Sequence, residues 1–273
     1  SAAPHGASAT VVDTLLDAAT ASSLDVHVVD VSADFRYANA EDFADVYGMP
    51  HAAPERLQQF CCAVPEHMPV STTPHIGHPG CFATAVLLAT VPLYVEELIE
   101  AAVFVSGITG STGSGRSPGA GTHHPERHAN LYAYKALAHR HVPEIEALIA
   151  DASGQTADVR FVPHSGPFAR GIYVTAQARL RRQQSTEDVL AMLTEFYAAS
   201  PFVQIVDTPP RLKDVLAGNR CHLSAVAHDD SVVVMCAIDN LVKGAAGGAM
   251  QWMNRLWSLP EESGLTAPSP AWT

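Results

Sequence analysis

The feature that most constrains this fold is an apolar segment, FATAVLLATVPL at 82–93, which directly follows a Pro-Gly turn and one cysteine. Its apolar residues surround the helical axis instead of forming one stripe, and such a helix must be buried on most of its faces. The chain of 273 residues, 47% of them hydrophobic, can supply the surrounding core. We therefore expect one large domain or two modest domains.

The first segments of the chain indicate an α/β protein. Residues 7–20 have helical spacing with Ser8 as the expected N-cap, and residues 25–30 form a valine-rich strand. This succession of helix and strand is half of a βαβ unit, which predicts a parallel sheet. The segment 37–68, which three prolines interrupt, is expected to be loop and short helix.

The later segments predict further strands and helices. Strands are expected at 101–105 and 171–180, and a hairpin is expected from 221–228 and 231–238. Helices are expected at 142–151 and at 244–257. A third helix is expected to begin after a capping box formed by Ser185 and Asp188.

The composition excludes several classes of protein. Lys and Arg number 16 against 28 Asp and Glu, and a chain this acidic is not expected to bind nucleic acid or an anionic membrane. No apolar run reaches 18 residues, so no transmembrane helix is predicted. The five cysteines have no framework spacing, which favours a reducing compartment, and we expect a cytoplasmic protein.

A candidate nucleophile lies in HPGCFATA at 78–85, where the Pro-Gly turn meets the apolar helix. Cys81 occupies the helix N-terminus, where the helix dipole and free amide groups stabilise a thiolate. Such a site can lower a thiol pKa from about 8.5 to between roughly 3.5 and 7.5, which predicts a reactive Cys81. A buried structural cysteine is the alternative, and it is the interpretation for Cys61, Cys62, Cys221 and Cys236.

Histidines supply the candidate acid or base. His139 and His141 lie at a helix junction, from which a ring can reach into a cleft. An ordinary surface position is the alternative for any one of the 14 histidines. No metal site is expected, because a proline interrupts the clustered histidines and no cysteine or carboxylate set completes a ligand shell. These clustered residues are His123, His124 and His128.

Two glycine-rich segments are candidates for ligand contact. The loop 107–121 offers free backbone amides and Arg116, which together suit a phosphate, and Arg170 is a second candidate for an anion. The glycines of DNLVKGAAGGAMQ at 239–251 let a ligand or a neighbouring backbone approach a helix start closely. Ordinary loop, surface and packing roles are the alternatives for all of them.

Motifs along nearly the whole chain carry a family resemblance. They are PHG at 4–6, VDVSADFR at 29–36, HPGCFATA at 78–85, SG at 106–107, GR at 115–116, AYKALAHRHVPEIE at 133–146, RGIYVTAQA at 170–178 and AIDNLVKGAAGGAMQ at 237–251. In this order they resemble the N-acetyl-γ-glutamyl-phosphate reductases of the aspartate-semialdehyde and glyceraldehyde-phosphate dehydrogenase group. HHPER at 123–127 is instead similar to the lysine-pathway relative, which reduces a carrier-bound aminoadipyl phosphate.

The resemblance implies an α/β plus α+β architecture, in which a Rossmann-type parallel-sheet domain joins a catalytic domain like that of glyceraldehyde-phosphate dehydrogenase. It places the later part of the dinucleotide-binding domain at 1–80 and the catalytic domain at 81–243. A helix that packs back on the first domain is implied at 244–273. Relatives begin with a strand and a GxxGxxG phosphate loop that do not precede Ser1 here, so we expect a fragment of a longer enzyme. They also form homo-oligomers, either dimers or tetramers.

The function that the resemblance implies is NADPH-dependent reduction of N-acetyl-γ-glutamyl phosphate to N-acetylglutamate semialdehyde, a step of arginine biosynthesis. Cys81 would form a thioester, and His141, or else His139, would transfer the proton. The sequence does not distinguish among an acetylglutamyl, a succinylglutamyl and a carrier-linked aminoadipyl group in the substrate. It also does not distinguish NADP from NAD. A cysteine-histidine hydrolase and a non-catalytic binding module are the alternatives from other classes.

The resemblance also assigns binding residues. Those implied for the substrate are Arg116, Arg170 and His139. Those implied to border the nicotinamide are Pro4, His5, Gly6, Ser106, Gly107, Asn240 and Gly244.

Overall fold

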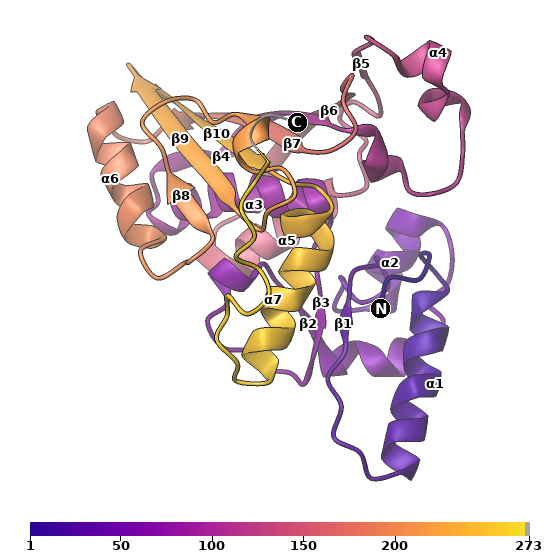
Figure 1. The fold of residues 1–273 in the computed structure, drawn as a ribbon. Helices are drawn as coiled ribbons and strands as arrows, with labels where there is room; N and C mark the ends of the chain where they lie inside the picture. The colour runs from indigo at the N-terminus through magenta and orange to yellow at the C-terminus, as the bar shows by residue number, and fades with distance from the viewer. Residues whose placement is uncertain (271–273) are drawn as a thin grey trace.

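Two β-sheets organise residues 1–270, the part of the chain that the computed structural model describes (Figure 1). The small sheet has three parallel strands in the order β1-β3-β2, formed by Val29–Asp30, His75–Gly77 and Phe60–Cys62. The large sheet has seven strands in the order β5-β6-β4-β7-β10-β9-β8. The last three residues of the predicted segment 244–273 lie outside the described part.

Helix α1 (Ser8–Ala21) covers the small sheet through its buried apolar side, which packs with Val28 and Phe35. The prediction that Ser8 caps this helix is wrong. Ser8 lies in the first turn, and its hydroxyl donates a hydrogen bond to the buried carboxylate of Asp30 (Oγ–Oδ1, 2.5 Å). A local cap gives way here to a contact between distant segments.

The segment 37–68 contains more regular structure than its sequence predicts. It includes helix α2 (Ala40–Tyr47), 3₁₀ turns at Pro54–Gln59 and Pro65–His67, and also strand β2. The expectation of loop and short helix missed β2, because a three-residue strand is too short to show alternation and here follows proline-bounded turns. Further 3₁₀ turns lie at Ser111–Ser114, Ala120–Thr122 and Leu212–Asp214.

The large sheet confirms most predicted strands. Strand β7 (Ile172–Leu180) has the expected alternation, and β9 (Cys221–His228) and β10 (Ser231–Ile238) form the expected hairpin. Strand β4 (Ile99–Thr109) runs well beyond the predicted residues 101–105, because β6 and β7 pair with it on either side. The remaining strands are β5 (Tyr132–Ala133), β6 (Asp158–Ser165) and β8 (Val203–Ile205).

Helix α3 (Cys81–Val95) is the centre of the main core. Every residue from 82 to 94 is buried, which confirms the prediction from its all-round apolar sequence. It packs against strands β4, β7 and β10 and against helix α5 (Val142–Ser153). Helix α6 (Thr186–Phe196), which begins with the predicted capping box, packs against β8 and β9.

The opposite face of the large sheet remains open. Side chains that alternate with the core residues reach solvent there, and Phe104 of β4 and Val226 of β9 are 53% and 49% exposed. At one edge of this sheet the segment between β4 and β6, which carries the short helix α4 (His124–Arg127), projects from the body of the molecule (Figure 1). None of the helices in the described residues is long and apolar enough to cross a membrane.

The chain returns to the small sheet near its C-terminus. A π-helical turn at Val242–Ala246 leads into helix α7 (Gly247–Leu256), which lies alongside strands β1 to β3 (Figure 1). Trp252 packs with Val29 and Ile76 and donates its indole N–H to the carbonyl of Ala63 (3.0 Å). One buried aromatic side chain thus joins α7 to the small sheet.

Replacing Trp252 by alanine should lower the free energy of unfolding by about 3–5 kcal/mol, because this 1% exposed ring leaves a large cavity and an unpaired carbonyl. Urea denaturation followed by circular dichroism measures the change. The matched control is Trp257→Ala, whose ring is 52% exposed and whose loss should cost about 1 kcal/mol or less. Equal losses for the two variants would contradict this account of α7.

Candidate active site

Cys81 begins helix α3 at the carboxyl edge of the small sheet. Strand β3 ends at Gly77, and a turn of residues 78–80, here named the Cys81 turn, leads directly into the helix, with Gly80 at its N-cap. The N–H of His78 donates to the carbonyl of Asp30 at the end of β1 (2.7 Å). The predicted position of Cys81 at a helix start is confirmed, and it lies at the sheet edge where parallel α/β folds bind ligands.

Cys81 lines a cavity of about 410 Å³, here named the Cys81 cavity. His139 and His141 line it as well, so the structure brings the predicted thiol and both predicted imidazoles together. The wall opposite α3 comes from the end of β4, the glycine-rich loop and β5. Residues of four chain segments therefore share one cavity.

The two histidines are held in different ways. The Nδ1 of His139 accepts the backbone N–H of His141 (3.2 Å), so a neutral His139 carries its proton on Nε2. The ring of His141 lies against Gly80, where a Cβ atom would come within 2.4 Å of Nε2. Gly80 thus lets the His141 ring approach the residue that precedes Cys81. Within the described residues the buried Nδ1 of His141 has no hydrogen-bond partner.

Burial governs the protonation of both imidazoles. It lowers the pKa of His139 to about 4, and Arg140 and Lys135 act in the same direction. Burial lowers the pKa of His141 well below its usual value, with a further contribution from Arg36. Both rings are therefore neutral at pH 7, and His141, whose Nδ1 has no partner within the described residues, can accept a proton.

The thiol does not have the lowered pKa that its helix position predicts. Burial raises the pKa of Cys81 above its usual value, and Glu144 adds to this effect. The Arg36 guanidinium and the backbone N–H groups of Phe82 and Cys81 favour the thiolate but do not compensate for the burial. Cys81 is therefore protonated at neutral pH, so a nucleophilic role for its sulfur requires a base that takes the proton.

The other cysteines lie in settings that suit structural roles. Cys221 and Cys236 are completely buried in β9 and β10, with their Sγ atoms 3.5 Å apart. Burial raises the pKa of Cys62 and of Cys221 well above the usual range. Cys61 contacts Met68 and Ser71. Of the five cysteines, Cys81 alone both begins a helix and lines the Cys81 cavity.

The predicted anion-binding arginines lie elsewhere. Arg116 is exposed and does not line the Cys81 cavity, and Arg170 is engaged by the buried carboxylate of Asp239 (Nη2–Oδ1, 3.1 Å). The cations that line this cavity are Lys135 and Arg140, which the sequence analysis did not single out. Both belong to AYKALAHRHVPEIE, the motif that also supplies the two histidines, so the sequence does contain a signal for them.

The predicted nicotinamide residues divide into two groups. Gly244 lies against Cys81, since a Cβ atom on Gly244 would be 2.8 Å from that of Cys81. The turn Pro4–Gly6 lies at the carboxyl edge of the small sheet, where Gly6 N–H donates to the Asp34 carboxylate (2.8 Å) and His5 Nδ1 accepts the N–H of Ala33 (3.0 Å).

Three other predicted nicotinamide residues are placed differently. Asn240 is buried and uses its amide within the protein, accepting from Gly171 N–H (2.7 Å) and donating to Thr112 Oγ1 (3.0 Å). Ser106 and Gly107 belong to β4 and not to the loop after it. Ser106 faces the open side of the sheet, and Gly107 packs between the rings of Phe82 and Phe161.

Gly244 and the turn Pro4–Gly6 suit the nicotinamide end of a dinucleotide. The absence of a side chain at Gly244 leaves backbone against Cys81, and the turn Pro4–Gly6 lies at the carboxyl edge of the small sheet, the edge that binds ligands in such folds. Within residues 1–270 no glycine-rich loop follows a strand of the small sheet. The described residues thus offer no GxxGxxG loop for the pyrophosphate.

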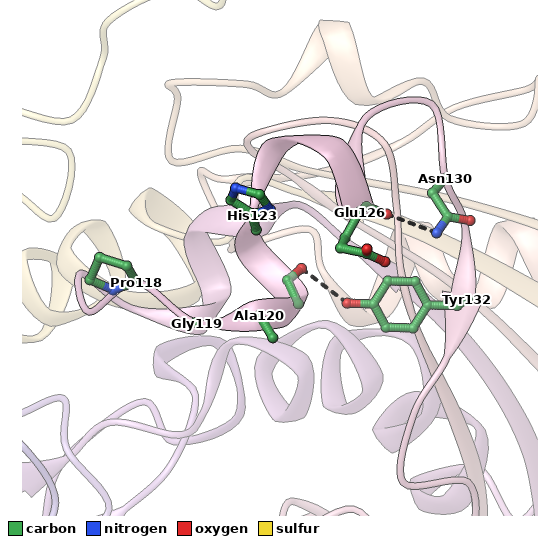
Figure 2. Close-up of a pocket in the computed structure, with 8 residues that line it drawn as sticks. Pro118, Gly119, Ala120, His123, Glu126, Asn130 and Tyr132 are labelled. Carbon is green, nitrogen blue, oxygen red and sulfur yellow. Dashed lines mark hydrogen bonds between the residues drawn. The ribbon is translucent and has the colours of Figure 1, made fainter.

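A larger cavity of about 790 Å³ lies in the projecting segment (Figure 2), and it shares the lining residue Tyr132 with the Cys81 cavity. Its walls come from residues 118–132, and two hydrogen bonds span them, from Tyr132 Oη to the carbonyl of Gly121 (3.2 Å) and from Asn130 Nδ2 to the carbonyl of Glu126 (2.9 Å). No cysteine lines it. The Cys81 cavity is therefore the candidate active site.

Comparisons with known proteins agree with this geometry. Residues 81–240 match the semialdehyde dehydrogenase, dimerisation domain family. The chain is 39% identical over 270 residues to the N-acetyl-gamma-glutamyl-phosphate reductase of Acidithiobacillus ferrooxidans (strain ATCC 53993 / BNL-5-31). The aligned region covers 97% of this chain and 77% of that protein. It is 39% identical over 272 residues to the reductase of the same name from Methanosarcina barkeri, covering 99% and 78%.

Solved structures share the fold. The aspartate semialdehyde dehydrogenase II of Vibrio cholerae aligns with a TM-score of 0.66 at 16% identity, over 92% of this chain and 77% of that one. The resemblance inferred from the motifs is thereby confirmed, and so is the expected α/β architecture. On these grounds the chain belongs to the N-acetyl-γ-glutamyl-phosphate reductase family.

Proposed function

We propose that this protein reduces N-acetyl-γ-glutamyl phosphate to N-acetylglutamate semialdehyde, with NADPH as the reductant, as part of arginine biosynthesis. The observation that carries this proposal is the Cys81 cavity, in which a helix-start thiol and two neutral imidazoles meet in a member of this reductase family. The names of the relatives give the acyl phosphate and the type of reaction. Neither a hydrolase nor a non-catalytic module has comparable support.

In the first step His141 takes the proton of Cys81, whose sulfur then attacks the acyl carbon. The carbon–oxygen bond to phosphate breaks, and phosphate leaves with the bonding electrons, so that a thioester forms on Cys81. Amides of the first turn of α3 lie near this carbon and can stabilise the developing oxyanion by roughly 3–4 kcal/mol. A neutral base is required because the thiol is protonated at rest.

When bound, NADPH supplies the hydride that reduces the thioester carbonyl. The tetrahedral carbon then releases the sulfur of Cys81 and becomes the aldehyde. His141 returns its proton to the departing sulfur, which restores both groups for the next cycle. His139 lines the same cavity with its Nδ1 occupied by the His141 N–H, and we assign its Nε2 proton a hydrogen bond to the substrate.

Charge in the Cys81 cavity suits an anionic substrate. Lys135 and Arg140 line it, and within the described residues no aspartate or glutamate does. This local positive charge contrasts with a formal net charge of −12 for the whole chain. We therefore assign the contacts with phosphate and carboxylate to Lys135 and Arg140, in place of Arg116 and Arg170.

The domain division follows the two sheets. We propose a dinucleotide-binding segment at 1–80, a catalytic domain at 81–243 and a returning C-terminal segment from 244. In support, the three parallel strands lie within the first range, and all seven strands of the large sheet lie within the second. The contact between Trp252 and the small sheet supports the third.

A homodimer across the open face of the large sheet is the proposed assembly. The matching family is described as a dimerisation domain, and its match covers this whole sheet. Exposed Phe104 and Val226 give the face apolar contacts for a second copy. The proposed location is the cytoplasm, because all five cysteines are free.

Cys81→Ala should abolish thioester formation and lower turnover by roughly 10⁴-fold or more, because no other group in the cavity can form the thioester. Incubation with N-acetyl-γ-glutamyl phosphate alone should add one acyl group to Cys81, seen by mass spectrometry and removed by hydroxylamine. Turnover is followed by the loss of NADPH absorbance. Cys61→Ala is the matched control and should acylate normally. Acylation that persists in Cys81→Ala would contradict the mechanism.

The two histidines can be separated by the same acylation assay. His141→Asn should slow acylation by about 10²–10⁴-fold, since it removes the proposed base. His139→Asn should slow it less, because an asparagine oxygen can still accept the His141 N–H. A larger loss in His139→Asn would exchange their roles.

Phe104→Glu should convert the dimer to a monomer, because it places a charge at the centre of an apolar contact. Light scattering coupled to size-exclusion chromatography measures the mass. Leu15→Glu, which changes a similarly exposed leucine on α1, is the control and should remain dimeric. A monomeric unmodified protein would contradict the proposed assembly.

A further inference from the structure

A buried ion pair lies directly beneath the Cys81 turn. Arg36, which follows β1, and Glu144, in the first turn of α5, are 3.3 Å apart (Nη1–Oε2). Their side chains are 5% and 0% exposed. The two residues come from segments 108 positions apart, and the pair joins the carboxyl edge of the small sheet to the helix that follows the catalytic histidines.

Each partner also holds one end of the Cys81 turn. Glu144 Oε1 accepts the backbone N–H of Gly80 (2.7 Å), the residue that caps α3. Arg36 Nε donates to the carbonyl of His78 (3.0 Å), and its Nη2 donates to the carbonyl of Val31 (2.9 Å). Both polar groups are thus satisfied by the backbone that carries the thiol.

Such a pair is costly to bury, and general stability does not explain it. Desolvation of two charges often cancels their attraction, so well-packed apolar residues would be at least as stabilising. What apolar residues cannot do is accept the Gly80 N–H and donate to the His78 carbonyl. The pair therefore orients the backbone of the Cys81 turn and places two charges at the start of α3.

We propose that Arg36 and Glu144 are positioning residues for the nucleophile, forming a charge-balanced clamp that fixes the Cys81 turn and sets the charge next to the Cys81 sulfur. The proposal rests on the proposed function only in taking Cys81 as the nucleophile. The guanidinium favours the thiolate and the carboxylate opposes it, and each offsets the other. Neither residue touches substrate in this role.

Other charged or titratable groups also surround the thiol and are left unchanged by the test. Lys243, which precedes Gly244, is turned away toward Glu66 (Nζ–Oε1, 2.5 Å) and Gln251. Those that line the cavity with Cys81 are Tyr132, Tyr134, Lys135, His139, Arg140 and His141.

The test is the pH dependence of Cys81 alkylation by iodoacetamide, followed by peptide mass spectrometry. Arg36→Met leaves a carboxylate without its cation, so the midpoint should rise by about one pH unit or more. Glu144→Gln keeps an oxygen for the Gly80 N–H but leaves a guanidinium unpaired, so the midpoint should fall by a similar amount. Both variants break the same ion pair, yet their shifts have opposite signs.

The opposite signs separate the clamp from a merely structural pair. If the pair only held the fold together, either variant would loosen the site, and both midpoints would move in the same direction. That result, or two unchanged midpoints, would overturn the proposal. Because alkylation needs neither substrate nor NADPH, the clamp and the proposed reductase activity can fail separately.

Two matched controls and an internal reporter complete the experiment. Arg56→Met breaks a remote ion pair with Asp13, and Glu146→Gln changes a carboxylate on the same helix that accepts the Val159 N–H (2.9 Å). Neither should move the midpoint. Labelling of the fully buried Cys221 and Cys236 reports unfolding.

If Arg36→Met unfolds by that criterion, Arg36→Lys supplies the decisive measurement. It retains the positive charge but not the fork that reaches both Glu144 and the His78 carbonyl. We expect a midpoint within about half a pH unit of the unmodified protein and a several-fold lower rate of acylation by the acyl phosphate. An unchanged acylation rate in a folded Arg36→Lys would overturn the positioning role.

Discussion

The burial of helix α3 is the constraint on which the rest of this structure depends. An apolar helix enclosed by β4, β7, β10 and α5 has only its ends near the surface, and its first residue is Cys81. The same burial that fixes the thiol in space also leaves it only partly accessible to water. Desolvation therefore outweighs the helix dipole, and the pKa of Cys81 is raised rather than lowered. The burial of α3 thus places the thiol at the site and at the same time makes the thiolate harder to form.

A protonated thiol makes the neutral imidazoles necessary. His139 and His141 are buried in the same cavity, and their own desolvation keeps both rings unprotonated at neutral pH. The Nδ1 of His141, which has no partner within residues 1–270, is then able to accept a proton. Burial thus keeps the thiol protonated, so that a base is needed, and it also keeps the His141 imidazole neutral, so that this ring can be the base. The cations Lys135 and Arg140 reinforce this arrangement, because each lies where it can attract an anionic substrate and both disfavour a charged His139 imidazole.

Local patterns allowed much of the fold to be predicted from the sequence. The all-round apolar helix α3, the alternation of β7 and the capping box of α6 depend on neighbouring residues, and all three are confirmed. Contacts between distant segments could not be predicted in this way. Ser8 bonds to Asp30 instead of capping its helix, β4 continues through Gly107 because two strands pair with it, and Glu144, which resembles an ordinary helix-start residue, binds the Gly80 N–H.

The site lies where the two sheets meet, and separate parts of the chain must hold that junction together. Arg36 reaches Glu144 on one side of Cys81, and on the other Gly244 places its backbone against the thiol. Lys243 anchors Gly244 through its buried contact with Glu66, next to the small sheet. Because the Arg36–Glu144 and Lys243–Glu66 contacts both join the first 80 residues to later segments, the geometry around the sulfur depends on the docking of both parts.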